Sequence, residues 1–307
     1  MHPSHPSDAG RNTPALHVLP TLAIRVAAAT DVGGRSYNED LTAYSLSDRF
    51  VCCVVADGAG GHGGGDVAAE LAVRSALATV AQTVAQTVAQ TVAQNVAQSV
   101  ERNDTASIAS RSVIADIPST ATTATSVFTA AAMQSTIEVA HQAVVSGQAG
   151  GGRLSTMCTT LVALCIDLAN NDAIWAHSGD SRLYLIRAGV IYRQTKDHSL
   201  MASMIEAGLI TQAQADVHPK RHVLLSALGV SGAPEIAIGS SDGPLQAGDT
   251  FVICTDGMWE HLPAEAILTR GGCASPSVWL DHLMATVQQR APVSADNCSA
   301  IAVWLDG

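Results

Sequence analysis

The sequence predicts an α+β layered sandwich with a mainly antiparallel sheet. Short apolar runs rich in β-branched residues alternate with turn signals, and some follow each other with no helix between them. We expect strands at residues 22–29, 50–56, 160–167, 173–178, 182–187, 190–194, 250–255 and 299–305. Helical spacing of apolar residues predicts helices at residues 64–100, 122–147, 263–270 and 276–290. Residues 173–178, 182–187 and 190–194 are predicted to pair as consecutive hairpins, which favours an antiparallel sheet.

The composition restricts the partners and the compartment. The chain carries 16 Lys+Arg against 27 Asp+Glu, a formal net charge of −11, which argues against nucleic acid or an anionic membrane as the main partner. No apolar run approaches the ~20 residues needed to span a bilayer. The seven cysteines show no C-x-x-C spacing and most lie in apolar runs, as expected in a reducing compartment. We therefore expect a cytoplasmic monomer without a membrane span.

Two segments stand apart from the predicted core. Residues 1–20 lack the basic and apolar regions of a signal peptide and are predicted to form a disordered tail. Residues 80–100 repeat an uncharged four-residue unit, which rotates by ~40° per unit on a helix, so its valines cannot form one packed face. We expect an insertion over 80–121 that lengthens a helix, projects from the core and ends in the polar loop 101–121. A coiled-coil seam is the alternative. Residues 21–307 are then one domain.

A glycine-rich turn follows the predicted strand 50–56. Gly58, Gly60 and Gly63 match the G-x-G-x-x-G pattern of dinucleotide-binding sites, in the strand–turn–helix context that such sites need. The same pattern requires an acidic residue about 20 positions further on, at the end of a second strand. Residues 77–83 contain no acid. Dinucleotide binding is therefore the weaker of two alternatives.

The other alternative is a metal site, because acidic residues recur at the ends of the predicted strands. Hard divalent cations such as magnesium and manganese prefer oxygen ligands, and one aspartate can bridge two of them. If the strand ends meet at one edge of the sheet, their carboxylates form a binuclear or larger site. The residues concerned are Glu39, Asp40, Asp57, Asp180, Asp256 and Asp296.

Taken in order, these motifs resemble the bacterial metal-dependent protein phosphatases, the PPM or type 2C family. The motifs are Arg35-Ser-Tyr-Asn-Glu-Asp, Val55-Ala-Asp-Gly-Ala-Gly-Gly-His, Thr159-Thr, Gly179-Asp-Ser-Arg, Thr195-Lys-Asp-His-Ser, Ala227-Leu-Gly, Thr255-Asp-Gly-Met-Trp and Asp296-Asn. Each is weak alone, but eight in family order are specific. The resemblance implies a four-layer α-β-β-α sandwich of two mainly antiparallel sheets, with the metal site in a cleft at the sheet edge. Residues 195–230 would form a flap beside it.

The resemblance also implies a core site for two cations, Mn²⁺ or Mg²⁺. Asp57 would bridge both ions, and Gly58 would offer its backbone carbonyl. Asp256 and Asp296 would bind the first ion, and Glu39 the second.

Further residues would surround this core. Asp40 would hold bound waters, and Asp180, Asp256 and Glu260 match the position of a third cation in bacterial members. Arg35 would bind the substrate phosphate, because its planar guanidinium matches two phosphate oxygens.

The implied reaction is hydrolysis of phosphoserine or phosphothreonine by in-line attack of a water that bridges the two cations. Some family members carry a histidine two residues after the bridging aspartate. Ala59 stands there in this chain, so we expect metal-bound water to protonate the leaving group. Cys158 and Ser226 also depart from the family's usual Gly and Arg.

The implied substrates are phosphorylated proteins. They would be a bacterial Ser/Thr kinase or its targets, such as forkhead-associated or secretion-system proteins. A pseudophosphatase acting as a binding module is the remaining alternative. It would normally lack a metal aspartate, whereas Asp57, Asp256 and Asp296 are all present.

Overall fold

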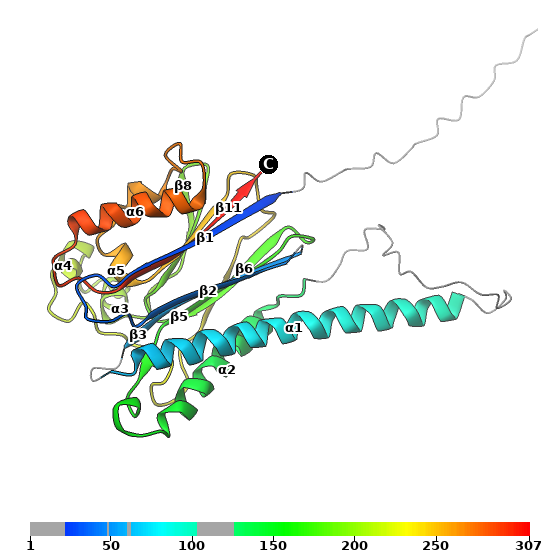
Figure 1. The fold of residues 1–307 in the computed structure, drawn as a ribbon, viewed down its shortest axis with the longest axis horizontal. Helices are drawn as coiled ribbons and strands as arrows, with labels where there is room; N and C mark the ends of the chain where they lie inside the picture. Colours follow the sequence, from blue (N-terminus) through cyan, green and yellow to red (C-terminus); the bar gives the residue numbers. More distant parts are fainter. Residues whose placement is uncertain (1–21, 48, 60–62, 103–125) are drawn as a thin grey trace, which may run out of the picture.

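Two β-sheets pack face to face in the computed structural model, which describes residues 22–47, 49–59, 63–102 and 126–307 (Figure 1). The first sheet has the order β1 (Ala23–Asp31), β11 (Cys298–Asp306), β10 (Thr250–Cys254), β7 (Arg182–Arg187) and β8 (Val190–Gln194). The second has the order β2 (Asp40–Leu46), β3 (Phe50–Ala59), β5 (Leu161–Asp167), β6 (Asp172–Ser178) and β9 (Ala237–Ser240), and β4 (Cys158–Thr159) pairs with β3. Neighbouring strands in both sheets are antiparallel.

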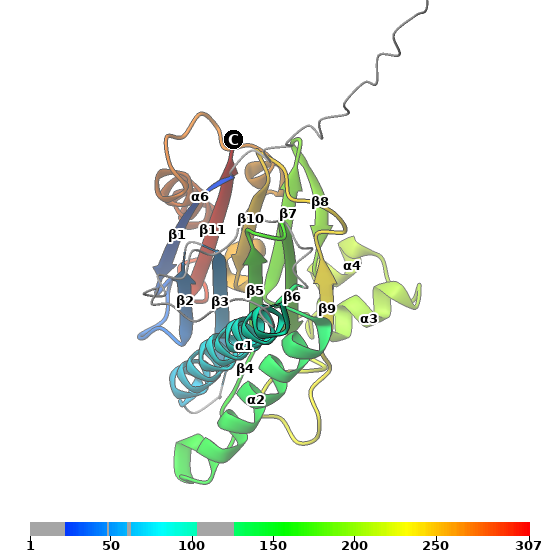
Figure 2. The same ribbon diagram turned by 90° about the vertical axis from the view of Figure 1, so that its right-hand side faces the viewer.

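Helices cover the outer face of each sheet. α1 (Gly65–Arg102) and α2 (Ala130–Gln148) lie on the second sheet, and α6 (Pro276–Arg290) lies on the first (Figure 2). Between the sheets, apolar side chains such as Leu164 and Phe251 are fully buried. The predicted four-layer α-β-β-α sandwich is therefore confirmed.

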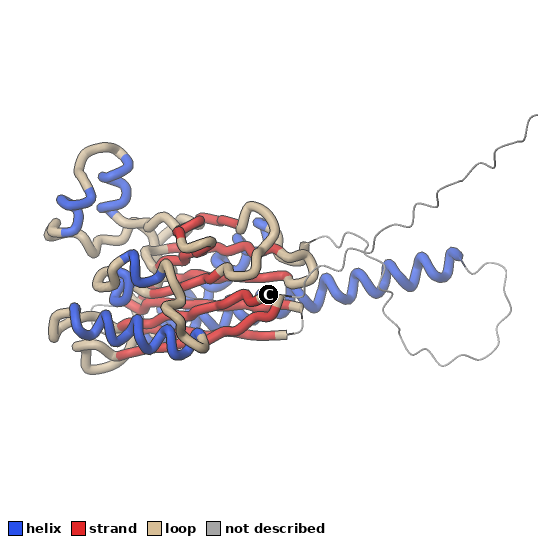
Figure 3. Tube along the Cα trace, turned by 90° about the horizontal axis from the view of Figure 1, so that it is seen from above, coloured by secondary structure: helices blue, strands red, loops and turns tan. Residues whose placement is uncertain are grey.

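The four-residue repeat continues α1 without a break, as predicted. Val80 is buried against the core and Val84 packs partly against it, after which the helix extends beyond the sheets (Figure 3). The hydroxyl groups of Thr79 and Thr83 donate to backbone carbonyls one turn earlier, which satisfies these polar side chains within the helix. The assignment of residues 80–121 as an insertion, and the alternative of a coiled-coil seam in the repeat, both stay predictions.

The predicted hairpin of residues 173–178 with 182–187 is wrong. β6 pairs with β5 and β9, whereas β7 pairs with β10 and β8 in the other sheet. The turn between them, at residues 179–181, crosses from one sheet to the other. Most residues of β6 and β7 are buried, because each strand has a neighbour on both sides and a covered face. The second predicted hairpin, β7 with β8, is confirmed.

Several short elements were not expected from the sequence. They are β2, β4, β9, α3 (Leu200–Glu206), α4 (Gln212–Asp216) and α5 (Asp256–Trp259). β2 is a partly exposed edge strand, and the three helices span too few turns to show a helical period. Side-chain caps from Ser199 and Thr211 begin α3 and α4.

Two predicted helices are shorter than expected. The helix expected at 263–270 is only a 3₁₀ turn over Ala264–Ile267. α2 begins at Ala130 behind its N-cap Thr129, and the first residues of its predicted range lie outside the described part. The predicted tail 1–20 and most of the loop 101–121 also lie outside it, although Glu101 and Arg102 belong to α1. None of the described helices is long and apolar enough to cross a membrane.

Candidate metal centre

The fold brings acidic residues from both sheets to one edge of the sandwich. Asp57 lies near the end of β3, directly opposite Asp40 in the register of β2. Asp256 begins α5 just after β10, and Asp296 lies just before β11 in the first sheet. Burial, followed by the negative charges of Asp256, Asp40, Asp180 and Asp296, raises the pKa of Asp57 well above its usual value. These five carboxylates therefore share one electrostatic environment.

Paired threonines fix the backbone at Asp57. The Asp57 carbonyl accepts hydrogen bonds from the Thr160 N–H at 2.9 Å and from the Thr159 hydroxyl at 2.8 Å. In return, the Asp57 N–H donates to Thr160 Oγ1 at 3.0 Å. The two threonines that follow the strand-forming Cys158 thus hold the predicted bridging residue from the neighbouring strands.

Gly58 is required by close packing. A Cβ atom there would lie 2.2 Å from the carbonyl oxygen of Gly65 and 2.6 Å from that of Glu39. Any larger residue would separate β3 from the first turn of α1. The close contact of Gly58 with Gly65 also allows the Gly65 N–H to donate to Glu39 Oε1 at 3.1 Å.

Asn297, the second residue of the Asp296-Asn motif, has a positioning role that the sequence analysis did not assign. It is buried, and its Oδ1 accepts from the Glu39 N–H at 2.8 Å. Its Nδ2 donates to the carbonyls of Val32 at 2.9 Å and Tyr37 at 3.1 Å. This side chain therefore ties the Glu39 segment to the start of β11. Its place directly after Asp296 was the available signal.

Three buried carboxylate oxygens accept no hydrogen bond within the described structure. They belong to Asp40, Asp66 and Asp256. The other Asp40 oxygen accepts from the Thr255 hydroxyl at 2.9 Å. Burial, and then nearby carboxylates, raise the pKa of Asp40 to about 7 and that of Asp256 to about 6. Because unpaired buried oxygens are costly and hard cations prefer such donors, this donor set fits Mg²⁺ or Mn²⁺.

Asp66 belongs to this region but was not predicted. It lies in the first turn of α1, next to Gly65, whose N–H contacts Glu39. An acidic residue is common in the first turn of a helix, so its position in the sequence does not suggest any further role.

Arg35 and Asp296 form an ion pair rather than lying apart. Arg35 Nη2 is 2.6 Å from Asp296 Oδ2, and Asp296 Oδ1 accepts from the Asn297 N–H at 2.8 Å. The side chains of Arg35 and Asp296 are 54% and 43% exposed, so the pair faces solvent at the rim of the site. The guanidinium expected to bind phosphate thus lies beside an expected cation ligand.

A second group of residues surrounds Asp180 next to the predicted flap. Burial, and then the negative charges of Asp256 and Asp197, raise the pKa of Asp180 to about 8. Trp259 Nε1 donates to the Asp180 carbonyl at 3.0 Å. Arg182 stacks on the Trp259 ring at 3.5 Å and binds both oxygens of Asp197, at 2.9 and 2.8 Å.

One compact set of candidate metal ligands occurs in the described part of the chain. One ligand atom each from His222, Asp256 and Glu260 lies within 4.8 Å of the others. Asp57, Asp296 and Glu39 do not form such a group with Asp256, and Asp180 does not join the set. A two-cation centre spreads its ligands over ions ~3.5–4 Å apart, so the assignment of each core ligand stays a prediction.

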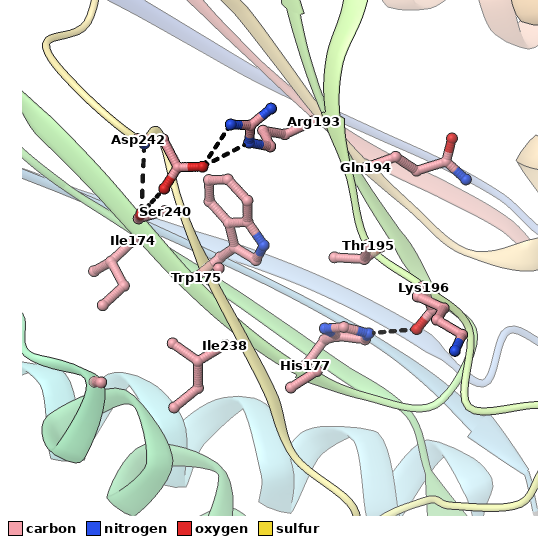
Figure 4. A pocket seen from close by; sticks show the side chains of 13 residues that line it. Ile174, Trp175, His177, Arg193, Gln194, Thr195, Lys196, Ile238, Ser240 and Asp242 are labelled. Carbon is pink, nitrogen blue, oxygen red and sulfur yellow. Dashed lines mark hydrogen bonds and ion pairs between the residues drawn. The ribbon is translucent and has the colours of Figure 1, made fainter.

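Two cavities flank the carboxylates, and another lies elsewhere. One of about 1080 Å³ is bordered by Asp180, Trp259 and Glu260, and one of about 300 Å³ by Asp296. A third, of about 480 Å³, lies between the edge strands β8 and β9 (Figure 4). There Arg193 pairs with Asp242, and His177 Nε2 donates to the Lys196 carbonyl at 2.8 Å. None of the predicted metal ligands borders this third cavity.

Comparison with known proteins assigns the family. The family of protein phosphatase 2C matches residues 33–296, which is most of the chain. The chain belongs to the protein phosphatase 2C family. A serine/threonine phosphatase stp of Listeria monocytogenes is 34% identical over 131 residues, which cover 43% of this chain and 50% of that protein. The match therefore spans about half the length of this relative.

Solved structures of serine/threonine phosphatases have the same architecture. The serine/threonine phosphatase PstP/Ppp of Mycobacterium tuberculosis superposes with a TM-score of 0.65 at 25% identity, covering 92% of this chain and 99% of that one. The catalytic domain of PstP in complex with two manganese ions gives a TM-score of 0.64 at 23% identity, covering 94% and 100%. The family match over residues 33–296 confirms the resemblance seen in the motifs.

The dinucleotide alternative fails on the observed fold. β3, which leads into the glycine-rich turn, has antiparallel neighbours on both sides, β2 and β5. Dinucleotide-binding folds of the G-x-G-x-x-G type require parallel strands joined by helices. The G-x-G-x-x-G pattern therefore begins on a strand of an antiparallel sheet, which does not fit a dinucleotide-binding fold.

Proposed function

We propose that this chain is a metal-dependent protein serine/threonine phosphatase with a binuclear Mn²⁺ or Mg²⁺ centre. The observation that carries the proposal is the cluster of carboxylates from both sheets at one edge, with unpaired buried oxygens on Asp40 and Asp256. Membership of the type 2C family supports the same conclusion. The cations at this centre would neutralise phosphoryl oxygens and lower the pKa of a nearby water, which makes a nucleophile available at neutral pH.

The residues of the chain would divide the binding of these ions. Asp57 would bridge the two cations with help from the Gly58 carbonyl, Asp256 and Asp296 would bind the first, and Glu39 the second. Asp40, held by Thr255, would orient the waters around them. A third cation would lie near Asp180, Asp256 and Glu260.

Arg35 would position the substrate. Its exposed guanidinium would turn from Asp296 to the phosphate, to which it can donate two parallel hydrogen bonds. Ala59 offers no proton for the leaving group, so the seryl or threonyl oxygen would take its proton from water at the centre. His62, the histidine that ends the glycine-rich motif, lies outside the described residues.

The proposed substrates are phosphoproteins made by a bacterial Ser/Thr kinase, or the kinase itself, with forkhead-associated and secretion-system proteins as candidates. We propose that residues 21–307 act as one catalytic domain, as a monomer in the cytoplasm. The site itself would recognise the phosphate group of these substrates.

Release of inorganic phosphate from a phosphothreonine peptide tests this function. We expect activity that requires Mn²⁺ or Mg²⁺, stops with EDTA, and falls by at least about a hundredfold in Asp57→Asn. Asp242→Asn, an exposed aspartate that pairs with Arg193 at a different edge, is the matched control and should keep full activity. Metal binding without any hydrolysis would favour the pseudophosphatase. Activity that survives EDTA would refute the metal mechanism.

A further inference from the structure

His222 lies opposite the carboxylates of α5, although no motif drew attention to it. It belongs to the segment between α4 and β9, within the predicted flap. His222 Nδ1 is 3.4 Å from Glu260 Oε1. Ligand atoms of His222, Glu260 and Asp256 lie within 4.8 Å of one another, although His222 comes from a different part of the chain than the two acidic residues.

Asp256, which begins α5, and Glu260, which caps its C-terminal end, present their carboxylates in a fixed arrangement. Asp256 and Glu260 are four residues apart, and the Glu260 N–H donates to the Asp256 carbonyl at 2.9 Å, so both side chains leave the same face of one helical turn. Asp256 Oδ1 is buried and has no hydrogen-bond partner in the described structure. A buried carboxylate oxygen without a partner is costly, and a cation is the partner that suits it.

From this geometry we infer that His222, Asp256 and Glu260 form a cation site with one nitrogen and two oxygen ligands, which prefers Mn²⁺ to Mg²⁺. Imidazole is a ligand for transition metals, whereas Mg²⁺ is bound almost entirely by oxygen. The inference adds to the proposed function a ligand from the flap. Asp180 does not join this compact set, so it would lie beside the third cation while His222 supplies the third ligand.

The site would connect the flap to the catalytic edge. The segment next to His222 is hydrogen-bonded to the start of α3, because the Leu200 N–H donates to the Val223 carbonyl at 2.9 Å and the Leu225 N–H to the His198 carbonyl at 2.8 Å. A cation held between His222 and α5 would therefore restrain α3 as well. Glu260 and neighbouring residues of α3 border the same cavity of about 1080 Å³. Occupancy by Mn²⁺ would thus control access to it.

Electron spin-echo spectroscopy of the full chain saturated with Mn²⁺ tests this inference directly. The core ligands proposed above are all oxygens, so a ¹⁴N coupling of a directly bound imidazole reports the new site alone. We expect this coupling in the wild type and in His261→Ala, and its loss in His222→Ala. His261 is the matched control, because it borders the same cavity and follows Glu260 in the chain.

Equilibrium binding of Mn²⁺ gives a second readout. His222→Ala should bind one fewer Mn²⁺, or bind it at least about tenfold more weakly, with its core sites unchanged. Trypsin should cleave the flap of this variant faster in Mn²⁺, and the side chain is 51% exposed, so the fold should be retained. Two Mn²⁺ bound with activity but no ¹⁴N coupling would overturn the inference alone. Absence of any Mn²⁺ binding would overturn the proposed function as well.

Discussion

Asp40 and Asp57 lie directly opposite each other in the register of β2 and β3. The pKa values of both carboxyl groups are raised. Burial raises the pKa of Asp40 from 3.8 to about 7, so the metal-free native state keeps a proton that the unfolded chain has released. Between about pH 4 and pH 7 the unfolded state therefore binds fewer protons, and the free energy of unfolding falls as pH rises.

Asp40→Asn should remove the contribution of Asp40 to this pH dependence. The amide oxygen can still accept from the Thr255 hydroxyl, but the side chain has no proton to lose. In EDTA, we expect the wild type to lose stability relative to Asp40→Asn as pH rises from about 4 to about 7, measured by urea unfolding. The stability of the wild type relative to Asp242→Asn should show no such trend with pH, because Arg193 lowers the pKa of Asp242. Parallel curves for the wild type and Asp40→Asn would contradict the assignment.

Among the elements, α1 serves two purposes along its length. Its first turns bury Ala72, Val73 and Val80 against the second sheet, whereas the part after Val84 extends past the sheets. Only the first part can contribute to the core, because hydrophobic stabilisation requires removal of apolar surface from water.

Deletion of residues 85–102 should leave the domain folded. It removes about five whole helical turns, so the chain leaves Val84 in nearly its original direction. We expect little change in Tm and unchanged Mn²⁺ affinity, measured by calorimetry. Val80→Ala, which acts within the buried part, should cost about 1–3 kcal/mol. Unfolding of the deletion variant would show that the repeat belongs to the core.

The flap is anchored to α5 by Arg182. This guanidinium binds both oxygens of Asp197 and stacks on Trp259, and both partners of the ion pair are largely buried. Lysine offers a point charge without the planar fork, so it cannot reproduce both contacts.

Arg182→Lys should therefore loosen the flap. We expect a loss of about 1–3 kcal/mol in stability and faster tryptic cleavage within residues 195–230. Arg193→Lys changes an exposed arginine that also binds an aspartate, and it should leave Tm nearly unchanged. Equal losses of stability in Arg182→Lys and Arg193→Lys would contradict a stronger contribution from the buried ion pair of Arg182.

At the scale of the whole molecule, the candidate centre joins the two sheets. Asp57 comes from the second sheet, whereas Asp256 and Asp296 follow and precede strands of the first. A cation bound to all three holds the sheets together only in the folded state, so it must stabilise that state.

Mn²⁺ should raise Tm in a concentration-dependent manner. At a hundred times the Kd, one bound ion contributes about 2.7 kcal/mol. Asp57→Asn should abolish most of this gain while remaining folded, as followed by differential scanning fluorimetry with circular dichroism as a check. A Tm that does not respond to Mn²⁺ in the wild type would argue against a centre shared by both sheets.

The local sequence predicted much of this protein. Runs of β-branched residues located most strands, the repeat predicted the long α1, and the motifs pointed to the carboxylates of the candidate metal centre. These features depend on neighbouring residues, since strand period, helix period and turn chemistry are short-range properties. Eight motifs in order then indicated the family, because each retains the residues that its chemistry needs.

Features that depend on contacts between distant segments were decided by the tertiary structure alone. The tight turn at residues 179–181 gives no sign that β6 and β7 belong to different sheets, since either strand can pair wherever its buried faces fit. Asn297 is polar in sequence but acts by reaching Val32, Tyr37 and Glu39. His222 comes near Glu260 only because the flap folds back onto α5. The sequence by itself thus determined which groups can bind a cation, and packing between remote segments decided which of them meet.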